Sequence, residues 1–306
     1  MKEPVIHLEH VRKTYGSLVA VADVSLDVHE GEIFGLIGPN GAGKTTTMEC
    51  VEGIRSPDSG AITVLGLDPV RDVYTLQERI GVQLQQAQLQ KRIKVWEAVK
   101  LWSSLYRKPS SQGEQLLEQL GLAEKRNAWF MTLSGGQKQR LFIALALIND
   151  PEVVFLDELT TGLDPQARHA IWELVRGIRL RGKTVFLTTH LMEEAERLCD
   201  RVAIMEHGSI VDMGRPSDLV DRHCPARNVI LATDASDASE RFARIPHLAS
   251  LTQQGNSYTL GGESEDFVSE VIDCLSEHRM HVTTFRTVLP TLEDVFLKLT
   301  GHSIRD

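Results

Sequence analysis

The sequence predicts an α/β domain built on a mostly parallel sheet, followed by a smaller α+β domain. Short apolar segments alternate with helical segments over the first two thirds of the 306 residues. Such alternation indicates βαβ crossovers. The pattern breaks at residues 221–227, where charged residues precede a proline. We therefore expect one domain over residues 1–222 and an accessory domain over residues 223–306.

The individual elements are predicted from apolar runs and from the glycine and proline residues that end them. In the first domain, strands are expected at residues 32–38, 62–65, 153–156 and 184–188. Helices are expected at residues 43–53, 95–106, 112–120, 136–149, 166–180 and 191–199. Residues 202–205 and 209–212 flank His207-Gly208 and suggest a hairpin. In the second domain, strands are expected at residues 228–232 and 281–286, and helices at residues 266–276 and 292–299.

Composition and charge restrict the class of protein. The chain carries 33 basic and 42 acidic residues, and this net charge of -9 argues against the basic surface of a nucleic-acid-binding protein. No apolar run approaches the roughly 20 residues that cross a bilayer, and the first residues lack the apolar core of a secretory signal. The four cysteines are widely scattered, which favours reduced thiols in a cytoplasmic protein over a metal site or a disulfide framework.

Residues 38–45, which we call the P-loop, fit the pattern G-x-x-x-x-G-K-[ST] between a predicted strand and a predicted helix. Glycines let the backbone curl so that successive N–H groups point at one anion, and the helix N-terminus adds its dipole. We expect Lys44 to reach the β- and γ-phosphates of a nucleoside triphosphate and Thr45 to ligate Mg²⁺. The residues predicted to contact the nucleotide here are Gly38, Pro39, Asn40, Gly41, Ala42, Gly43, Lys44, Thr45 and Thr46.

The apolar strand at residues 153–156 ends in two carboxylates, Asp157 and Glu158. A buried parallel strand places its carboxyl end beside the phosphate-binding turn of its neighbour. There Asp157 can hold Mg²⁺, directly or through water, and Glu158 can polarise the attacking water as a general base. The alternative is that both carboxylates simply end the strand at the surface.

The segment Leu133-Ser134-Gly135-Gly136-Gln137 leads into another predicted helix and provides a second N-terminus suited to phosphate. Together with the P-loop and the acidic strand end, this segment resembles the signature of ATP-binding cassette (ABC) ATPases. The resemblance covers approximately residues 4–220 and implies a P-loop NTPase fold with a helical subdomain that carries the signature. It also implies a head-to-tail homodimer. Each nucleotide would lie between one P-loop and four residues of the other copy, Ser134, Gly135, Gly136 and Gln137.

Further residues match the family by position. Tyr15 resembles the aromatic residue that stacks on adenine, and Asp164 lies in a segment that looks like the dimer-contact loop. Gln85 resembles the glutamine that touches Mg²⁺ or the attacking water, although neighbouring glutamines leave that assignment open. His190 resembles the switch histidine that hydrogen-bonds the γ-phosphate. The resemblance thus implies a catalytic set of Glu158, His190 and Gln85 and a metal-contacting set of Thr45, Gln85 and Asp157.

One position departs from the family pattern. Leu159 follows Glu158 where ABC ATPases usually have proline. Because proline restrains φ, its loss leaves the turn that carries Glu158 less constrained.

The function implied by the resemblance is that of a transport ATPase with ATP and Mg²⁺ as cofactors. Residues 191–196, 199–204 and 290–296 look like the ATPase subunits of ABC-2-type, two-component exporters of drugs, lipids, polysaccharides or cofactors. In that subgroup the membrane permease is a separate polypeptide, which agrees with the missing apolar spans. The subunit is then expected in the cytoplasm, peripheral on the cytoplasmic face of the membrane and attached through the permease. The segment around residues 86–106 is expected to face the permease.

Two alternatives remain open at this point. The chain could be a soluble ABC-type ATPase that acts on ribosomes, DNA ends or cluster assembly. The chain has a single cassette, no sustained heptad repeat and a net negative charge, and these features disfavour that interpretation. It could also be a nucleotide-dependent regulator that hardly hydrolyses ATP, although the presence of Glu158 and His190 argues against this.

Overall fold

The computed structural model describes residues 3–83, 88–107, 112–235, 237–264 and 266–301. The chain divides into two compact units, the first ending at Pro216 and the second beginning at Ser217. The boundary expected between residues 222 and 223 lies at the end of a helix, α8 (Pro216–His223), and stays a prediction.

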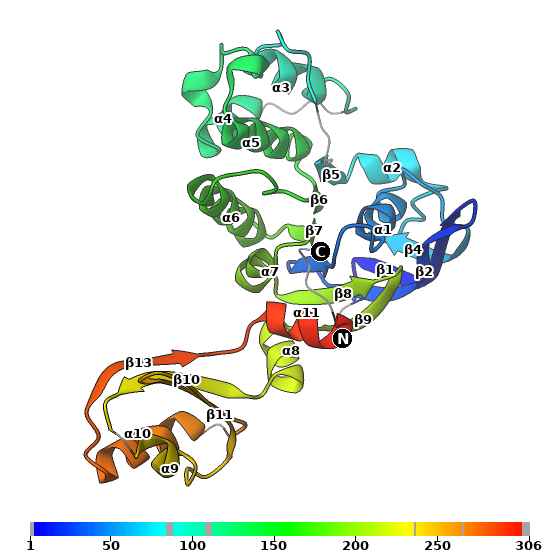
Figure 1. Cartoon of the computed structure of the whole chain (residues 1–306). Helices are drawn as coiled ribbons and strands as arrows, with labels where there is room; N and C mark the ends of the chain where they lie inside the picture. Colours follow the sequence, from blue (N-terminus) through cyan, green and yellow to red (C-terminus); the bar gives the residue numbers. More distant parts are fainter. Residues whose placement is uncertain (1–2, 84–87, 108–111, 236, 265, 302–306) are drawn as a thin grey trace. The chain divides into compact units, whose positions relative to one another are not determined.

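Strands from the described part of the first unit form one mixed sheet (Figure 1), in the order β4-β1-β2-β9-β8-β3-β7-β6-β5. Its strands are β1 (Ile6–Tyr15), β2 (Leu18–Val28), β3 (Ile33–Ile37), β4 (Ser59–Val64), β5 (Ile80–Gln83), β6 (Val153–Asp157), β7 (Thr184–Thr189), β8 (Arg201–Glu206) and β9 (Ser209–Gly214). The pairs among β5, β6, β7, β3 and β8 are parallel, and β1 pairs antiparallel with β2 and β4. The expected mostly parallel core is therefore present, with an antiparallel layer added to it.

The centre of the sheet is buried on both faces. Every residue of β3, β6 and β7 is buried, and β3 and β6 are nearly continuous apolar runs, as parallel strands covered on both faces are. The order β3-β7-β6 places their carboxyl ends side by side at one edge. Residues that follow these three strands therefore meet in space.

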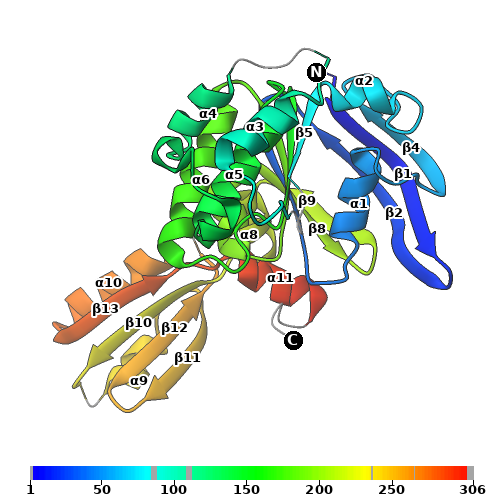
Figure 2. The same cartoon turned by 90° about the horizontal axis from the view of Figure 1, so that it is seen from above.

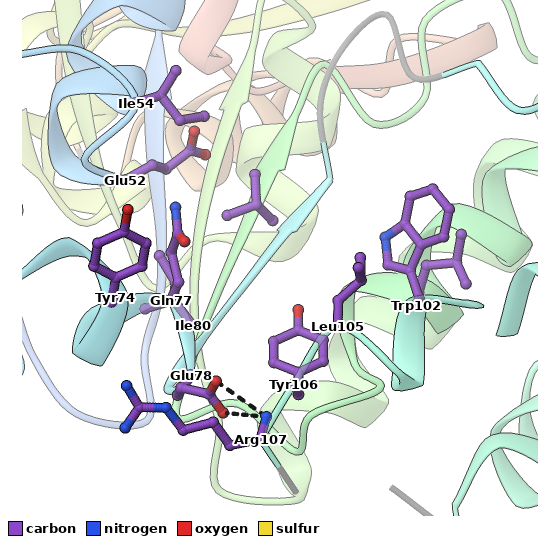
Figure 3. Close-up of a pocket in the computed structure, with 12 residues that line it drawn as sticks. Glu52, Ile54, Tyr74, Gln77, Glu78, Ile80, Trp102, Leu105, Tyr106 and Arg107 are labelled. Carbon is purple, nitrogen blue, oxygen red and sulfur yellow. Dashed lines mark hydrogen bonds between the residues drawn. The ribbon is translucent and has the colours of Figure 1, made fainter. Parts of the chain in front are cut away.

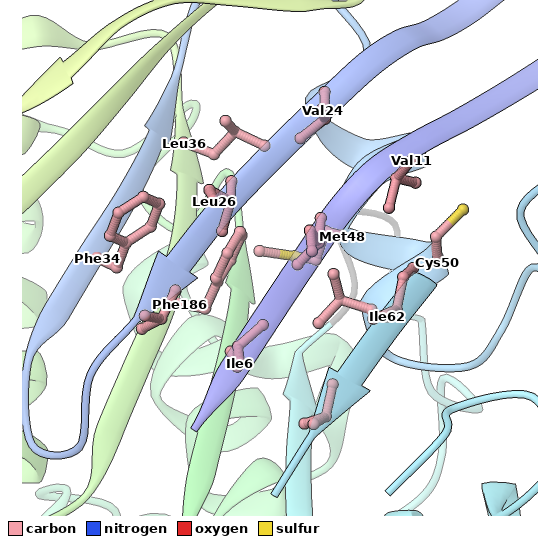
Figure 4. Close-up of a cluster of buried hydrophobic side chains, with 14 of the residues drawn as sticks. Ile6, Val11, Val24, Leu26, Phe34, Leu36, Met48, Cys50, Ile62 and Phe186 are labelled. Carbon is pink, nitrogen blue, oxygen red and sulfur yellow. The ribbon is translucent and has the colours of Figure 1, made fainter. Parts of the chain in front are cut away.

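Within the antiparallel layer, the sequence analysis assigns β4, expected at residues 62–65, but not β1 and β2; β5 is also unassigned. Strands β1 and β2 precede residue 32, and their register shifts three times between Leu8 and Thr14. Within β1, His10 has a φ of 50°. These irregularities break the strict alternation that identifies a half-buried strand in a sequence. Side chains of β1, β2 and β4 nevertheless pack with Phe34, Met48 and Phe186 in one hydrophobic core (Figure 4).

Some helices of the first unit pack together in a group that can be seen in both views (Figures 1 and 2). Helices α3, α4 and α5 contact one another and lie on the side of the sheet away from β1 and β4. This group is the predicted helical subdomain. The helices are α1 (Lys44–Val51), α2 (Val73–Gln77), α3 (Val95–Ser103), α4 (Gly113–Gln119), α5 (Gly135–Ala146), α6 (Pro165–Leu180) and α7 (Met192–Leu198), with 3₁₀ turns at Ala123–Lys125 and Phe130–Thr132.

The second unit contains an antiparallel sheet in the order β11-β12-β10-β13. Its elements after α8 are β10 (Arg227–Thr233), α9 (Ala238–Phe242), β11 (Leu248–Gln254), β12 (Ser257–Gly262), α10 (Phe267–Glu277), β13 (Val282–Val288) and α11 (Leu292–Thr300). Phe242, Tyr258 and Phe267 belong to its own hydrophobic core. The hairpin of β11 and β12 is absent from the sequence prediction. Within the described residues, no helix combines the length and the apolar character needed to span a bilayer.

Candidate functional site

The P-loop is built between β3 and α1, because β3 ends at Ile37 and α1 begins at Lys44. Glycine is required at two of its positions. A Cβ added at Gly43, whose φ is 102°, would lie 2.2 Å from the carbonyl oxygen of Ala20. A Cβ added at Gly38 would lie 2.2 Å from the carbonyl oxygen of Met205. The loop can therefore approach its neighbours closely only without side chains at these positions.

Lys44 is the buried cation of the loop. It is 4% exposed, and its Nζ donates hydrogen bonds to the carbonyl oxygens of Gly38 at 2.9 Å and Pro39 at 2.8 Å. Burial lowers the pKa of Lys44, while the nearby carboxylates of Glu158 and Asp157 raise it. The lysine is thus held at the P-loop by groups that a phosphate oxygen could replace as acceptors.

Asp157 lies at the end of β6, in register with Thr188 of β7. Its Oδ1 accepts hydrogen bonds from Thr188 Oγ1 and, at 3.4 Å, from Thr45 Oγ1. Burial raises the pKa of Asp157, and the two hydroxyl hydrogen bonds oppose that rise. Thr45 and Asp157 together offer hard oxygen ligands of the kind that Mg²⁺ prefers, so this pair fits the predicted metal site.

Glu158 lies beside His190, as expected for residues that follow adjacent strands. His190 Nδ1 is 3.4 Å from Glu158 Oε1, and Thr161 Oγ1 donates to Glu158 Oε2 at 3.4 Å. The side chain of Glu158 is 8% exposed and that of His190 24%. The backbone N–H of Glu158 donates to Thr188, to the carbonyl oxygen at 3.1 Å and to Oγ1 at 3.2 Å. Glu158 also has a φ of 46°, a conformation that is unusual for a residue with a side chain.

The signature forms the N-terminus of α5. Ser134 Oγ accepts from the N–H of Gln137 at 3.3 Å, and Gln137 Oε1 accepts from the N–H of Ser134 at 3.0 Å. This reciprocal pair is a capping box, which fixes the start of the helix. Cβ atoms added at Gly135 and Gly136 would meet only Leu163 and Ala167 among the described residues. No described P-loop atom lies within 4 Å of either position.

Of three other predicted residues, the structure describes Asp164 and Tyr15. Asp164 caps α6, because its Oδ1 accepts from the N–H of Ala167 at 2.9 Å. Tyr15 is 39% exposed at the end of β1, with Lys13 Nζ 5.7 Å and Arg55 Cζ 5.4 Å from its ring centroid. The role of Tyr15 in adenine stacking stays a prediction. Gln85 lies outside the described residues.

Several residues at this edge were missed by sequence reasoning. Thr188 hydrogen-bonds both Asp157 and Glu158, and its position in a pair of threonines before His190 is the only sequence signal for it. Leu159, the departure from the family pattern, is 2% exposed. No pattern in the sequence identifies its neighbour Thr160 as part of a buried contact.

A pocket of about 600 Å³ opens elsewhere in the first unit (Figure 3). Its lining is mostly apolar and aromatic, with a few charged groups. Glu52 is 2% exposed, and burial, Asp157 and Glu49 raise its pKa well above the ordinary value. Glu78 accepts from the N–H of Arg107 at 3.2 and 3.4 Å. The lining residues are Glu52, Ile54, Tyr74, Gln77, Glu78, Ile80, Val82, Trp102, Leu105, Tyr106, Arg107 and Leu145.

Comparison with known families gives two matches along the chain. Residues 21–161 match the family described as "ABC transporter". Residues 214–300 match "ATP-binding protein DrrA1-3-like, C-terminal domain". The first match includes the P-loop, the signature, Asp157 and Glu158, and the second includes most of the second unit.

Curated relatives align over nearly the whole chain. "Nod factor export ATP-binding protein I" of Cupriavidus pinatubonensis is 39% identical over 99% of this chain and 92% of its own length. The protein of the same name from Rhizobium johnstonii is 40% identical over 98% of this chain and 96% of its own length.

Solved structures share the fold of the first unit. A "structure of ATP binding subunit of ABC transporter" has a TM-score of 0.65 at 27% identity, over 71% of this chain and 92% of that chain. A "dimeric structure of a post-hydrolysis state of the ATP-binding cassette MJ0796 bound to ADP and Pi" has a TM-score of 0.62 at 28% identity, over 69% and 98%.

These similarities confirm the predicted fold class and the predicted transport ATPase, and they favour it over a soluble ATPase or a regulator. With such identity maintained along almost its entire length, the chain belongs to the family of ATP-binding subunits of ABC export transporters.

Proposed function

We propose that this subunit binds ATP with Mg²⁺ between two copies of itself and hydrolyses it to drive export through a separate membrane permease. The observation that carries the proposal is the meeting of the P-loop, Asp157, Glu158 and His190 at the carboxyl ends of β3, β6 and β7. Because these three strands are adjacent, Lys44 as the cation, Asp157 as the metal ligand and Glu158 as the general base can act on one triphosphate.

The proposed chemistry is an in-line attack of water on the γ-phosphoryl group, which breaks its bond to the bridging oxygen of the β-phosphate and yields ADP and inorganic phosphate. Lys44 binds β- and γ-phosphate oxygens in place of the carbonyl oxygens of Gly38 and Pro39. Glu158 takes the proton of the attacking water, and His190, 3.4 Å from it, hydrogen-bonds the γ-phosphate. Bound by Thr45 and Asp157, Mg²⁺ supplies positive charge against the phosphate oxygens.

A second copy completes the site in this proposal. The capped N-terminus of α5 presents Ser134, Gly135 and Gly136, and no described P-loop atom lies near either glycine. The signature is therefore available to the nucleotide of another subunit, where the N–H groups of α5 face the γ-phosphate. The dimeric relative of 28% identity supports this arrangement. Tyr15, Thr46, Gln137 and Asp164 keep their predicted nucleotide contacts within it.

The pocket is proposed as the attachment site of the permease. It lies in the first unit, and several of its lining residues belong to the segment expected to face the permease, Trp102, Leu105 and Tyr106 among them. Tyr74 is 78% exposed and Leu105 68%, so an apolar segment of a partner could cover both. Attachment there places the subunit on the cytoplasmic face of the membrane. The name of the relatives supports an exported cargo of the Nod factor kind.

Mixing two inactive variants tests the shared site. Lys44→Ala removes the P-loop cation, and Ser134→Arg blocks the signature, so each variant alone should lose ATPase activity. A mixed dimer retains one complete site, made of the P-loop of the Ser134→Arg subunit and the signature of the Lys44→Ala subunit. We expect mixing to restore up to about a quarter of the wild-type turnover, since half of the dimers are mixed and each has one working site.

The matched control replaces the Ser134→Arg partner with a subunit that carries both substitutions. No complete site can then form, and mixing should restore nothing. Recovery in the control, or none in the test with both variants folded and exchanging subunits, would refute the shared site.

A further inference from the structure

A further buried carboxylate lies four residues after His190. Glu194 of α7 is 1% exposed. Its Oε1 accepts hydrogen bonds from Thr160 Oγ1 at 2.8 Å and from Trp172 Nε1 at 2.9 Å. Thr160 is 1% exposed and Trp172 2%, so the whole contact is buried. We call these three residues the Glu194 triad.

The triad joins the two segments that carry the proposed catalytic residues. Thr160 lies two residues after Glu158, in the loop between β6 and α6. Glu194 lies four residues after His190, near the start of α7. The side chains of Glu158 and His190 themselves are 3.4 Å apart. A shift of the loop against α7 would therefore change that separation directly.

The loop needs such a restraint because its conformation is not supported by its own sequence. Glu158 has a φ of 46°, which is strained for a residue with a Cβ and persists only when the surroundings impose it. Leu159 has no ring to fix its own φ, as a proline at this position would. Within the loop, the N–H of Thr161 donates to the Glu158 carbonyl at 3.3 Å and that of Leu163 to the Thr160 carbonyl at 3.2 Å. The bond from Thr160 to a buried carboxylate is shorter, and hydrogen bonds to charged acceptors are the stronger class.

Because the triad is buried, the loss of one hydrogen-bond donor to Glu194 costs free energy. A buried carboxylate that loses its donors keeps its desolvation penalty without compensation. Movement of Thr160 away from Glu194 is therefore opposed, and Trp172 holds the carboxylate from α6 at the same time. Hydrogen bonds to one oxygen, Glu194 Oε1, thereby connect the β6–α6 loop and α6 to α7.

We propose that Glu194 is a positioning residue for ATP hydrolysis: through Thr160 and Trp172 it fixes the loop that carries Glu158 against the helix that follows His190. The proposal rests on the catalytic roles proposed above for Glu158 and His190. Glu194 itself contacts no P-loop residue by a hydrogen bond within the described part of the chain. It acts on the geometry of the base and not on nucleotide affinity.

Steady-state ATPase kinetics of the full-length protein distinguish positioning from a merely structural role. Glu194→Ala should lower kcat about tenfold or more, because misplacement by about 1 Å costs a catalytic group much of its effect. KM for ATP should stay within about twofold, since Lys44 and Tyr15 are untouched. Glu194→Gln keeps an acceptor oxygen and should retain kcat within about threefold of wild type.

Two further variants isolate the mechanism. Thr160→Val removes the hydroxyl donor with little change in shape and should lower kcat as Glu194→Ala does, with the double variant no worse than either single one. In a Glu158→Gln background, Glu194→Ala should leave the residual rate unchanged, because no base remains to be positioned. Glu32→Gln is the control for loss of a buried carboxylate: Glu32 is 9% exposed and pairs with Arg201 at 3.1 Å, and its loss should lower Tm without lowering kcat.

The possible results separate cleanly. Full kcat in folded Glu194→Ala or Thr160→Val protein, or additive losses in their double variant, would overturn the proposal. An equal further loss in the Glu158→Gln background would assign Glu194 a general structural role instead. If Glu194→Ala fails to fold, Thr160→Val carries the test alone. Wild-type turnover of Glu158→Gln by itself would remove the proposed catalytic role of Glu158, a failure distinct from that of Glu194.

Discussion

His190 Nδ1 lies 3.4 Å from Glu158 Oε1, although 32 residues separate the two along the chain. The proximity follows from sheet order, because β6 and β7 are parallel neighbours and each residue comes directly after its strand. A contact of 3.4 Å is long for a hydrogen bond, which leaves room for both groups to turn toward water and phosphate. The predictions below start from this pair.

Glu158→Gln should bind ATP and fail to turn it over. The amide keeps the size of the side chain but cannot accept the proton of water, so we expect kcat to fall by about 10²-fold or more. The ATP-loaded variant should accumulate as a closed dimer, measured by light scattering after size-exclusion chromatography. Glu173→Gln, which changes an exposed carboxylate on α6, is the control. A strictly monomeric ATP-loaded Glu158→Gln protein at high concentration would contradict the dimer.

Lys44→Ala should abolish detectable ATP binding in calorimetric titration. The variant loses the charge that meets the β- and γ-phosphates, while the fold loses only two hydrogen bonds to loop carbonyls. Because burial lowers the pKa of Lys44, its removal also relieves a desolvation penalty, and Tm should change little. Lys100→Ala on the surface of α3 is the matched control. Unchanged affinity for ATP in Lys44→Ala would exclude the proposed role of the P-loop in phosphate binding.

Glu52→Gln should stabilise the subunit at neutral pH. The folded state raises the pKa of Glu52, so the unfolded chain ionises first as pH rises above its ordinary value of 4.5. The folded state binds the extra proton in this window, and stability is lost as pH rises toward the raised pKa. We expect Tm of Glu52→Gln to exceed wild type by about 2 °C or more at pH 7.5, for a gain of about 1 kcal/mol. At pH 4 the two proteins should unfold together.

The exposed carboxylate of Glu124 provides the control for this measurement, since Glu124→Gln should leave Tm unchanged at both pH values. A lower Tm for Glu52→Gln at pH 7.5 would show that the carboxylate has a stabilising partner.

Tyr74→Asp should detach the subunit from its permease without damage to the fold. Tyr74 is 78% exposed at the rim of the pocket, so a charge there costs little until an apolar segment must cover it. In membranes that contain the intact transporter, we expect the variant subunit to appear in the soluble fraction on centrifugation and to lose ATP-driven transport. Its basal ATPase in solution should match wild type. Leu180→Asp, equally exposed at 82% but outside the pocket lining, should remain bound.

The sequence analysis succeeds where one short motif determines both conformation and chemistry. The P-loop, the acidic strand end and the signature each combine a backbone requirement with a charged or phosphate-binding group, and the structure places each between the expected elements. Strands β1 and β2 escaped the prediction, because bulges and the positive φ of His10 disturb their alternation. The β11–β12 hairpin escaped it as well, since most of β11 is exposed and carries few apolar residues.

The particular hydrogen bonds that support the site from distant segments could not be predicted. The hydrogen bonds of Thr188 to Asp157 and of Thr160 to Glu194 depend on the register of β6 with β7 and on the packing of α7. A lone threonine or glutamate has no pattern that reports a buried partner. Sequence reasoning therefore predicted the groups that we propose to contact the nucleotide, but not the residues that hydrogen-bond to those groups.

The adjacency of β3, β7 and β6 carries one more consequence. Ile37 pairs with Thr189, and Thr188 pairs with Asp157. The residues with proposed catalytic roles therefore follow strands whose register is fixed by backbone hydrogen bonds. Loss or gain of one residue within any of these three strands would turn every side chain beyond it to the opposite face. Such length changes should abolish ATP hydrolysis even when each motif is intact.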